Sequence, residues 1–144
     1  MKILVENSEL MKQLLTTLLA ISGRKTTPRH AVYIMETTIE KLKKQYSFLN
    51  EIDIIDTTFL EEGDQVTVMG KVNNVSKNEF GHALKDIIYN LTENLGNDAG
   101  HFFLKEISQK LNEESVSTMR DFGIDLGIMQ LEQTVSKMEN IFLK

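Results

Sequence analysis

The chain of 144 residues contains no cysteine and no tryptophan, and its only proline is Pro28. Without cysteine, a disulfide, a thiolate metal site and a cysteine nucleophile are all excluded. No apolar run approaches the roughly 18 residues that a membrane-spanning helix needs. The opening residues MKILVENSEL hold three apolar residues before Glu6, too few for the apolar segment of a signal peptide. We therefore expect a cytoplasmic protein with no membrane partner.

What is present is the composition of an ordinary globular protein. Hydrophobic residues make up 41% and charged residues 26%, which excludes the low-complexity and disordered classes. A chain of this length buries about two-thirds of the surface that its unfolded form exposes, enough for a real core. We find no internal repeat or linker, so residues 1–144 are predicted to form a single domain.

Charge is divided unevenly along the chain. Residues 1–49 carry a net charge of +4, whereas residues 50–144 carry −9, and the whole chain has −5. Such a division is typical of a basic binding surface, or of two parts that attract each other within or between chains. A solvated acidic surface that keeps the protein in solution explains it equally well.

The first part of the chain, residues 1–48, is predicted to be a helical hairpin. Apolar residues recur every three or four positions over residues 8–21, and Asn7 or Ser8 is placed to cap that helix, which Gly23 would end. Thr27 and Pro28 are the N-cap and first residue expected of a second helix, which the apolar spacing carries to about residue 48.

Residues 50–73 are predicted to form an antiparallel β-hairpin. Residues 51–60 are rich in β-branched types, and residues 65–72 alternate strictly, with Val66, Val68, Gly70 and Val72 on one face. The acidic turn 61–64 would join the two strands.

Residues 76–144 are predicted to be helical. Ser76 and Glu79 form a capping box, with Val75 and Phe80 as the matching hydrophobic staple. The sequence thus predicts an α+β, mostly helical fold, with an N-terminal αα-hairpin, a central β-hairpin and three to four C-terminal helices.

The last predicted helix starts at Asp125 and reaches about residue 143. Five apolar residues in it alternate spacings of three and four, which is the a/d pattern of a two-heptad coiled-coil seam: Ile128, Leu131, Val135, Met138 and Phe142. We predict association as a homodimer through this helix, the N-terminal hairpin, or both.

One histidine stands in a suggestive context. The string His82-Ala83-Leu84-Lys85 resembles the His-x-Leu-Lys centre of histidine phosphotransfer domains and of the phosphoacceptor helix of sensor kinases. That resemblance implies an exposed phosphoacceptor at His82, with Lys85 one turn away to hold the phosphoryl group. The sequence departs from the pattern at Asp86, where the transfer domains have glycine and where a carboxylate repels phosphate.

The N-terminal part also contains a basic cluster. Arg24, Lys25 and Arg29 flank the start of the second predicted helix, where an anion or phosphate group would be attracted. A winged helix-turn-helix interpretation is opposed by the length of that helix and by the acidic turn 61–64, so nucleic acid is not the expected partner.

No catalytic set is assembled by the sequence. The histidines His30, His82 and His101 lie on three different predicted helices, without the spacing of a metal site. We therefore expect no cofactor, no metal and no enzyme. The favoured function is that of a regulatory or adaptor protein that acts by helix-mediated association with a protein partner. The alternatives are histidine phosphotransfer through His82, and a regulator that responds to a small molecule or a nucleic acid.

Overall fold

The computed structural model describes residues 6–55, 66–95, 97–111, 113–129, 131–132 and 135. For Lys25, and for those of residues 95–102 that fall in these ranges, the structure describes the backbone but not the side chain. The predicted turn at 61–64 and the seam residues Met138 and Phe142 lie outside the described residues.

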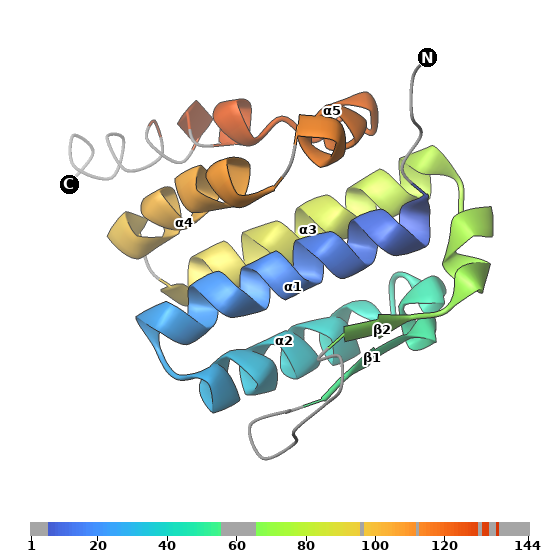
Figure 1. Ribbon diagram of the computed structural model, residues 1–144, viewed down its shortest axis with the longest axis horizontal. Coiled ribbons are helices and arrows are strands. Elements are labelled where there is room, and N and C mark those ends of the chain that lie inside the picture. Colours follow the sequence, from blue (N-terminus) through green and yellow to red (C-terminus); the bar gives the residue numbers. More distant parts are fainter. Residues whose placement is uncertain are drawn as a thin grey trace.

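The described chain is an α+β fold that is mostly helical and has one antiparallel hairpin (Figure 1). Its elements are α1 (Asn7–Lys25), α2 (Pro28–Leu42), the 3₁₀ turn η1 (Ser47–Glu51), β1 (Ile52–Ile54), β2 (Val66–Val68), the 3₁₀ turn η2 (Gly70–Asn74), α3 (Lys77–Leu95), α4 (Asn97–Lys110) and α5 (Glu113–Asp121). Residues 126–129, 131–132 and 135 are helical too and are called the last helix.

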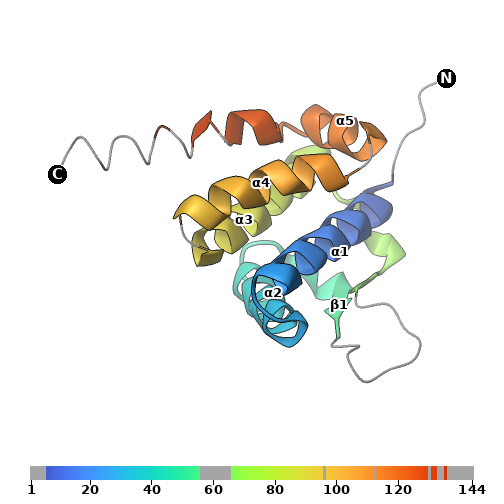
Figure 2. The same cartoon turned by 60° about the vertical axis from the view of Figure 1, so that its left-hand side comes forward.

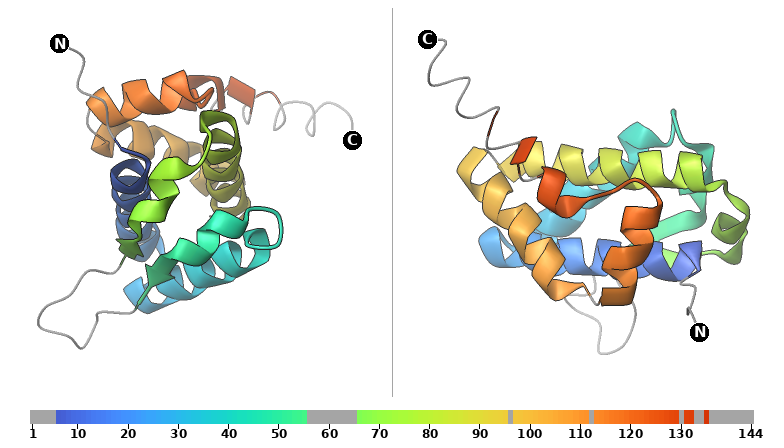
Figure 3. Two further views of the ribbon diagram at one scale, coloured as in Figure 1. Left: turned by 90° about the vertical axis from the view of Figure 1, so that its right-hand side faces the viewer. Right: turned by 90° about the horizontal axis from the view of Figure 1, so that it is seen from above.

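Helix α1 lies at the centre of the molecule. It packs against α2, α4, β2 and η2, while α3 packs against α2 and α4. Viewed nearly along their axes, α1 and α3 form a middle layer between α2 on one side and α4 on the other (Figure 3, left). Leu10, Leu14 and Leu18 of α1 have no exposed surface. The apolar stripe predicted for residues 8–21 is thus buried within one chain, which leaves none of it for a partner.

The first turn of α1 is hydrogen-bonded to residues that are distant in the sequence. The side chain of Asn73, in η2, accepts a hydrogen bond of 2.8 Å from the backbone N–H of Ser8. The amide of Asn7 donates to the backbone carbonyls of Val72 and Val75, each at 3.2 Å. The predicted local cap by Asn7 or Ser8 is therefore wrong, because a side chain 65 residues further along satisfies the first turn.

The hairpin is shorter than predicted. Its strands have three residues each and pair antiparallel, with Ile52 opposite Val68 and Ile54 opposite Val66. The second predicted strand stops at Val68, because η2 turns the chain so that Val72 becomes buried and Asn73 reaches α1. Helix α2 is shorter too: it ends at Leu42 instead of near residue 48, and η1 follows it.

Three predicted helix starts are confirmed by their caps. The hydroxyl of Thr27 accepts from the N–H of His30 at 3.1 Å, with Pro28 at the first helical position. The hydroxyl of Ser76 accepts from the N–H of Glu79 at 3.3 Å at the start of α3. A carboxylate oxygen of Asp125 accepts from the N–H of Ile128 at 3.1 Å at the start of the last helix.

Candidate functional site

The last helix is oriented by the turn that precedes it. Gly123 has a φ of 89°, in the left-handed region that glycine adopts at little cost, and it reverses the chain at the end of α5. Leu126 and Met129, in the first turn of the last helix, are 5% and 2% exposed. This side of the helix therefore packs onto the body of the molecule, where the red ribbon lies beside α4 in Figures 1 and 2.

A hydrogen bond ties the same helix to α3. The phenol of Tyr89 donates to a carboxylate oxygen of Glu132 at 2.6 Å. Burial, this hydrogen bond and the charge of Glu132 raise the pKa of Tyr89 to about 12. The phenol therefore stays protonated, and able to donate, at every physiological pH.

An apolar strip runs along the other side of this helix. Ile128, Leu131 and Val135 are 53%, 65% and 51% exposed, which places them among the most exposed large hydrophobic residues described. At 100° per residue, the centre of the strip lies about 160° around the helix axis from the side that carries Leu126 and Met129. The strip therefore points away from the body, and it consists of the described members of the predicted a/d seam.

The residues singled out for phosphotransfer, His82 and Lys85, lie one turn apart on α3, and their role stays a prediction. His82 is exposed, as its place on the helix predicts. The ammonium of Lys85 lies 5.8 Å from the centre of the Tyr89 ring, one turn further from His82 along α3. Asp86 accepts a hydrogen bond of 2.5 Å from the phenol of Tyr46. The carboxylate that repels phosphate is thus held in place, while the cation is engaged elsewhere.

Burial, the hydrogen bond to Asp86 and the charges of Asp86 and Glu79 raise the pKa of Tyr46 to about 12. The phenol therefore stays protonated at neutral pH and donates to Asp86, which ties η1 and α2 to α3. Gly81, next to His82, is buried: a Cβ there would lie 2.5 Å from the carbonyl oxygen of Phe122. This part of α3 is therefore a packing contact with the end of α5.

The residues of the predicted basic cluster differ in their surroundings. Arg24 forms an ion pair and hydrogen bond with Glu106, which joins the end of α1 to α4. Arg29 is exposed in the first turn of α2. The side chain of Lys25 lies outside the described residues. An anion site at these three residues stays a prediction, and Arg24 would have to leave Glu106 to serve it.

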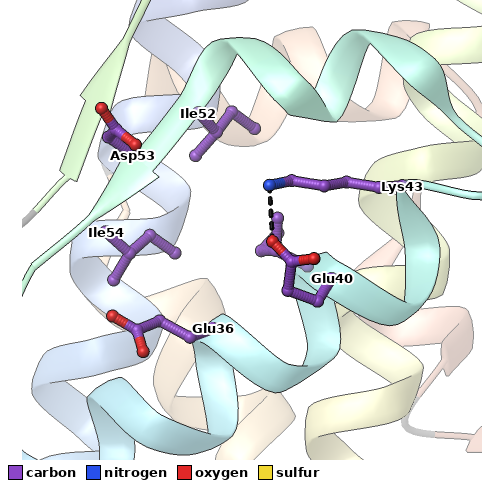
Figure 4. Close-up of a pocket in the computed structure, with 7 residues that line it drawn as sticks. Glu36, Glu40, Lys43, Ile52, Asp53 and Ile54 are labelled. Atoms are coloured by element: carbon purple, nitrogen blue, oxygen red, sulfur yellow. Dashed lines mark hydrogen bonds and ion pairs between the residues drawn. The ribbon is translucent and has the colours of Figure 1, made fainter.

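A cleft between α2 and β1 gathers charged groups that the sequence analysis did not single out (Figure 4). Lys43 reaches Glu40 at 2.7 Å, and Glu36 lies below Ile54 at the other end of the cleft. Within the described residues, no group of three or more His, Cys, Asp or Glu side chains is arranged to hold a metal ion. The cleft therefore combines charged side chains with an apolar wall.

Among the described residues, no helix combines the length and the apolar character that crossing a membrane requires. Comparison with protein-family models, curated proteins and solved structures finds no match to this chain.

Sequence reasoning located the apolar strip but missed what orients it. Tyr89 follows Ile88 in α3, and nothing in its neighbourhood in the sequence indicates Glu132, 43 residues away, as its partner. The same holds for Tyr46 and Asp86, which are 40 residues apart. An isolated tyrosine next to a buried stripe was the one available signal, because its ring prefers burial and its hydroxyl needs a partner.

Proposed function

We propose that the protein is a non-enzymatic regulatory or adaptor protein of the cytoplasm that acts by self-association through its last helix. The observation that carries the proposal is the outward direction of the apolar strip, Ile128, Leu131 and Val135, on a helix whose opposite side is already buried. A row of apolar side chains with coiled-coil spacing is a surface suited to another helix.

The strip has no simple way to turn inward. Rotation of the last helix toward the body would expose Leu126 and Met129 and would break the hydrogen bond between Tyr89 and Glu132. Exposing each of those two side chains costs about 1.5–3 kcal/mol. The helix therefore keeps its present orientation, and the strip is covered best by a second chain.

The spacing of apolar residues in the last helix favours a second copy of this chain as the partner. The a/d spacing continues after Val135 at Met138 and Phe142, so that the strip is part of a two-heptad pattern. A seam of this period packs against an identical seam when two helices supercoil around each other. Self-association needs one such surface on each copy, which this chain provides.

The test is the mass in solution at about 10–100 µM, measured by light scattering for three proteins. The wild type is expected to be a dimer, and Leu131→Glu a monomer, because the substitution places a charge in the seam of both copies. Loss of two buried leucines raises the dissociation constant more than about a hundredfold.

Met69→Glu is the matched control. Met69 is 54% exposed and precedes η2, away from the last helix. In this variant too, glutamate replaces an exposed apolar side chain, but on another surface. This variant is expected to stay a dimer. A monomeric wild type, or equal dissociation of the two variants, would overturn the proposed function.

A further inference from the structure

We infer that two copies of the chain pair their last helices in parallel and in register, as a two-stranded coiled coil. This inference rests on the proposed function and adds to it the orientation of the partner. It follows from the residue types on the strip and from the charge beside it.

The residue types on the strip favour two parallel strands. Ile128 and Val135 lie seven residues apart and occupy the a positions, while Leu131 occupies the d position between them. β-Branched residues at a, combined with leucine at d, favour parallel dimers over higher oligomers. All three side chains are at least half exposed in the single chain, so they are available to form the layers of such a seam.

The charge beside the strip distinguishes the two orientations. Glu132 follows Leu131 and occupies the e position, and Glu139 repeats that position seven residues later in the sequence. In an antiparallel pair the e positions of the two helices face each other, which brings carboxylates together. In a parallel pair each e position faces a g position, and the g position before Ile128 is Gly127, which has no charge.

The absence of cysteine allows a direct test, because a single introduced thiol reports on its own position. In the parallel arrangement Ile128→Cys faces the same residue of the second copy, and small movements of the two helices bring the thiols to the geometry that a disulfide requires. Mild oxidation is then expected to yield covalent dimer about tenfold or more faster than for the exposed control Met69→Cys, since association raises the local thiol concentration.

Leu131→Cys is a second variant of the same kind, which keeps the test valid if Ile128→Cys weakens the dimer. An equal mixture of Leu131→Cys and Val135→Cys probes the other orientation, because an antiparallel pair packs the d position of Leu131 against the a position of Val135. A dimer by light scattering that cross-links in this mixture, and not at residue 128 or 131 alone, overturns the parallel orientation and leaves the proposed function standing. A monomer at about 100 µM overturns both.

Discussion

Gly81 lies where α3 passes the end of α5, and its lack of a side chain sets the distance between the two helices. The rings of Phe80 and Phe122 meet edge to face beside it, with centroids 5.4 Å apart. A Cβ on residue 81 would stand 2.5 Å from a backbone oxygen, which cannot rotate away as a side chain could. Glycine is therefore needed at this position because it has no side chain, and not because its backbone is flexible.

Gly81→Ala is expected to destabilise the protein by about 2 kcal/mol, even though alanine favours helices more than glycine does. The reason is overpacking against α5, which must shift. Gly70→Ala is the control, because a Cβ there meets nothing within 4 Å, and this variant should stay within about 0.5 kcal/mol of the wild type. Urea unfolding measures both, and a Gly81→Ala protein as stable as Gly70→Ala would contradict the close approach.

At the scale of elements, the sequence predicted the N-cap correctly for those helices whose capping residue lies next to them. Thr27 with Pro28, Ser76 with Glu79, and Asp125 each satisfy N–H groups within three residues, so a local pattern was sufficient. The alternation at residues 65–72 predicted a strand that is too long, because η2 begins after Val68 and brings Asn73 to α1. A tertiary contact of this kind leaves no local pattern in the sequence.

The candidate site could likewise be predicted only where a local sequence pattern exists. The spacing of Ile128, Leu131 and Val135 identified the strip, but residues 8–21 carry an equally apolar stripe, which proved to be fully buried. Periodicity reports that a helix has an apolar side, and it does not report what covers that side. The orientation of the last helix depends on Tyr89 and Glu132, a pair that only the folded chain brings together.

Two substitutions compare a cap with a buried strand position. Ser76→Ala removes the hydroxyl that accepts from Glu79 and is expected to cost about 1 kcal/mol. Val66→Asp places a carboxylate at a site that is 1% exposed, next to α1, and should cost about 3 kcal/mol or more. Denaturant unfolding of both variants checks the order, and equal losses would contradict the burial of β2.

At the scale of the whole molecule, the uneven charge of the sequence finds a partial explanation. The N-terminal part, with +4, and the rest, with −9, are joined by contacts such as the ion pair of Arg24 with Glu106. These charges attract within one chain and steer α4 toward α1, although exposed pairs of this kind contribute little each.

Stability should decline at alkaline pH for a reason that the structure specifies. Tyr46 and Tyr89 have pKa values raised to about 12, against about 10 in an unfolded chain. Below pH 10 both states keep these phenols protonated, and the full stabilisation is present. Between pH 10 and 12 the unfolded chain loses the protons while the folded chain keeps them, so the free energy of unfolding falls as pH rises.

Thermal melts from about pH 9 to 12 measure this fall, and Tyr89→Phe is expected to show a shallower one because one of the two groups is removed. The same variant lacks the hydrogen bond to Glu132 and should loosen the last helix at neutral pH. Identical pH dependence in Tyr89→Phe and the wild type would show that the phenol of Tyr89 is not held as described.

The cap that Asn73 provides for α1 also sets an order of events during synthesis. The first turn of the central helix is completed by a residue made 65 positions later. At translation rates of about 5–20 residues per second, the nascent helix waits roughly 3–13 seconds for its cap. During that time the apolar stripe of α1, which is buried in the folded protein, has neither the cap nor α3 and α4 to cover it. The α1 segment of the growing chain is consequently one that a chaperone recognising apolar helices would bind.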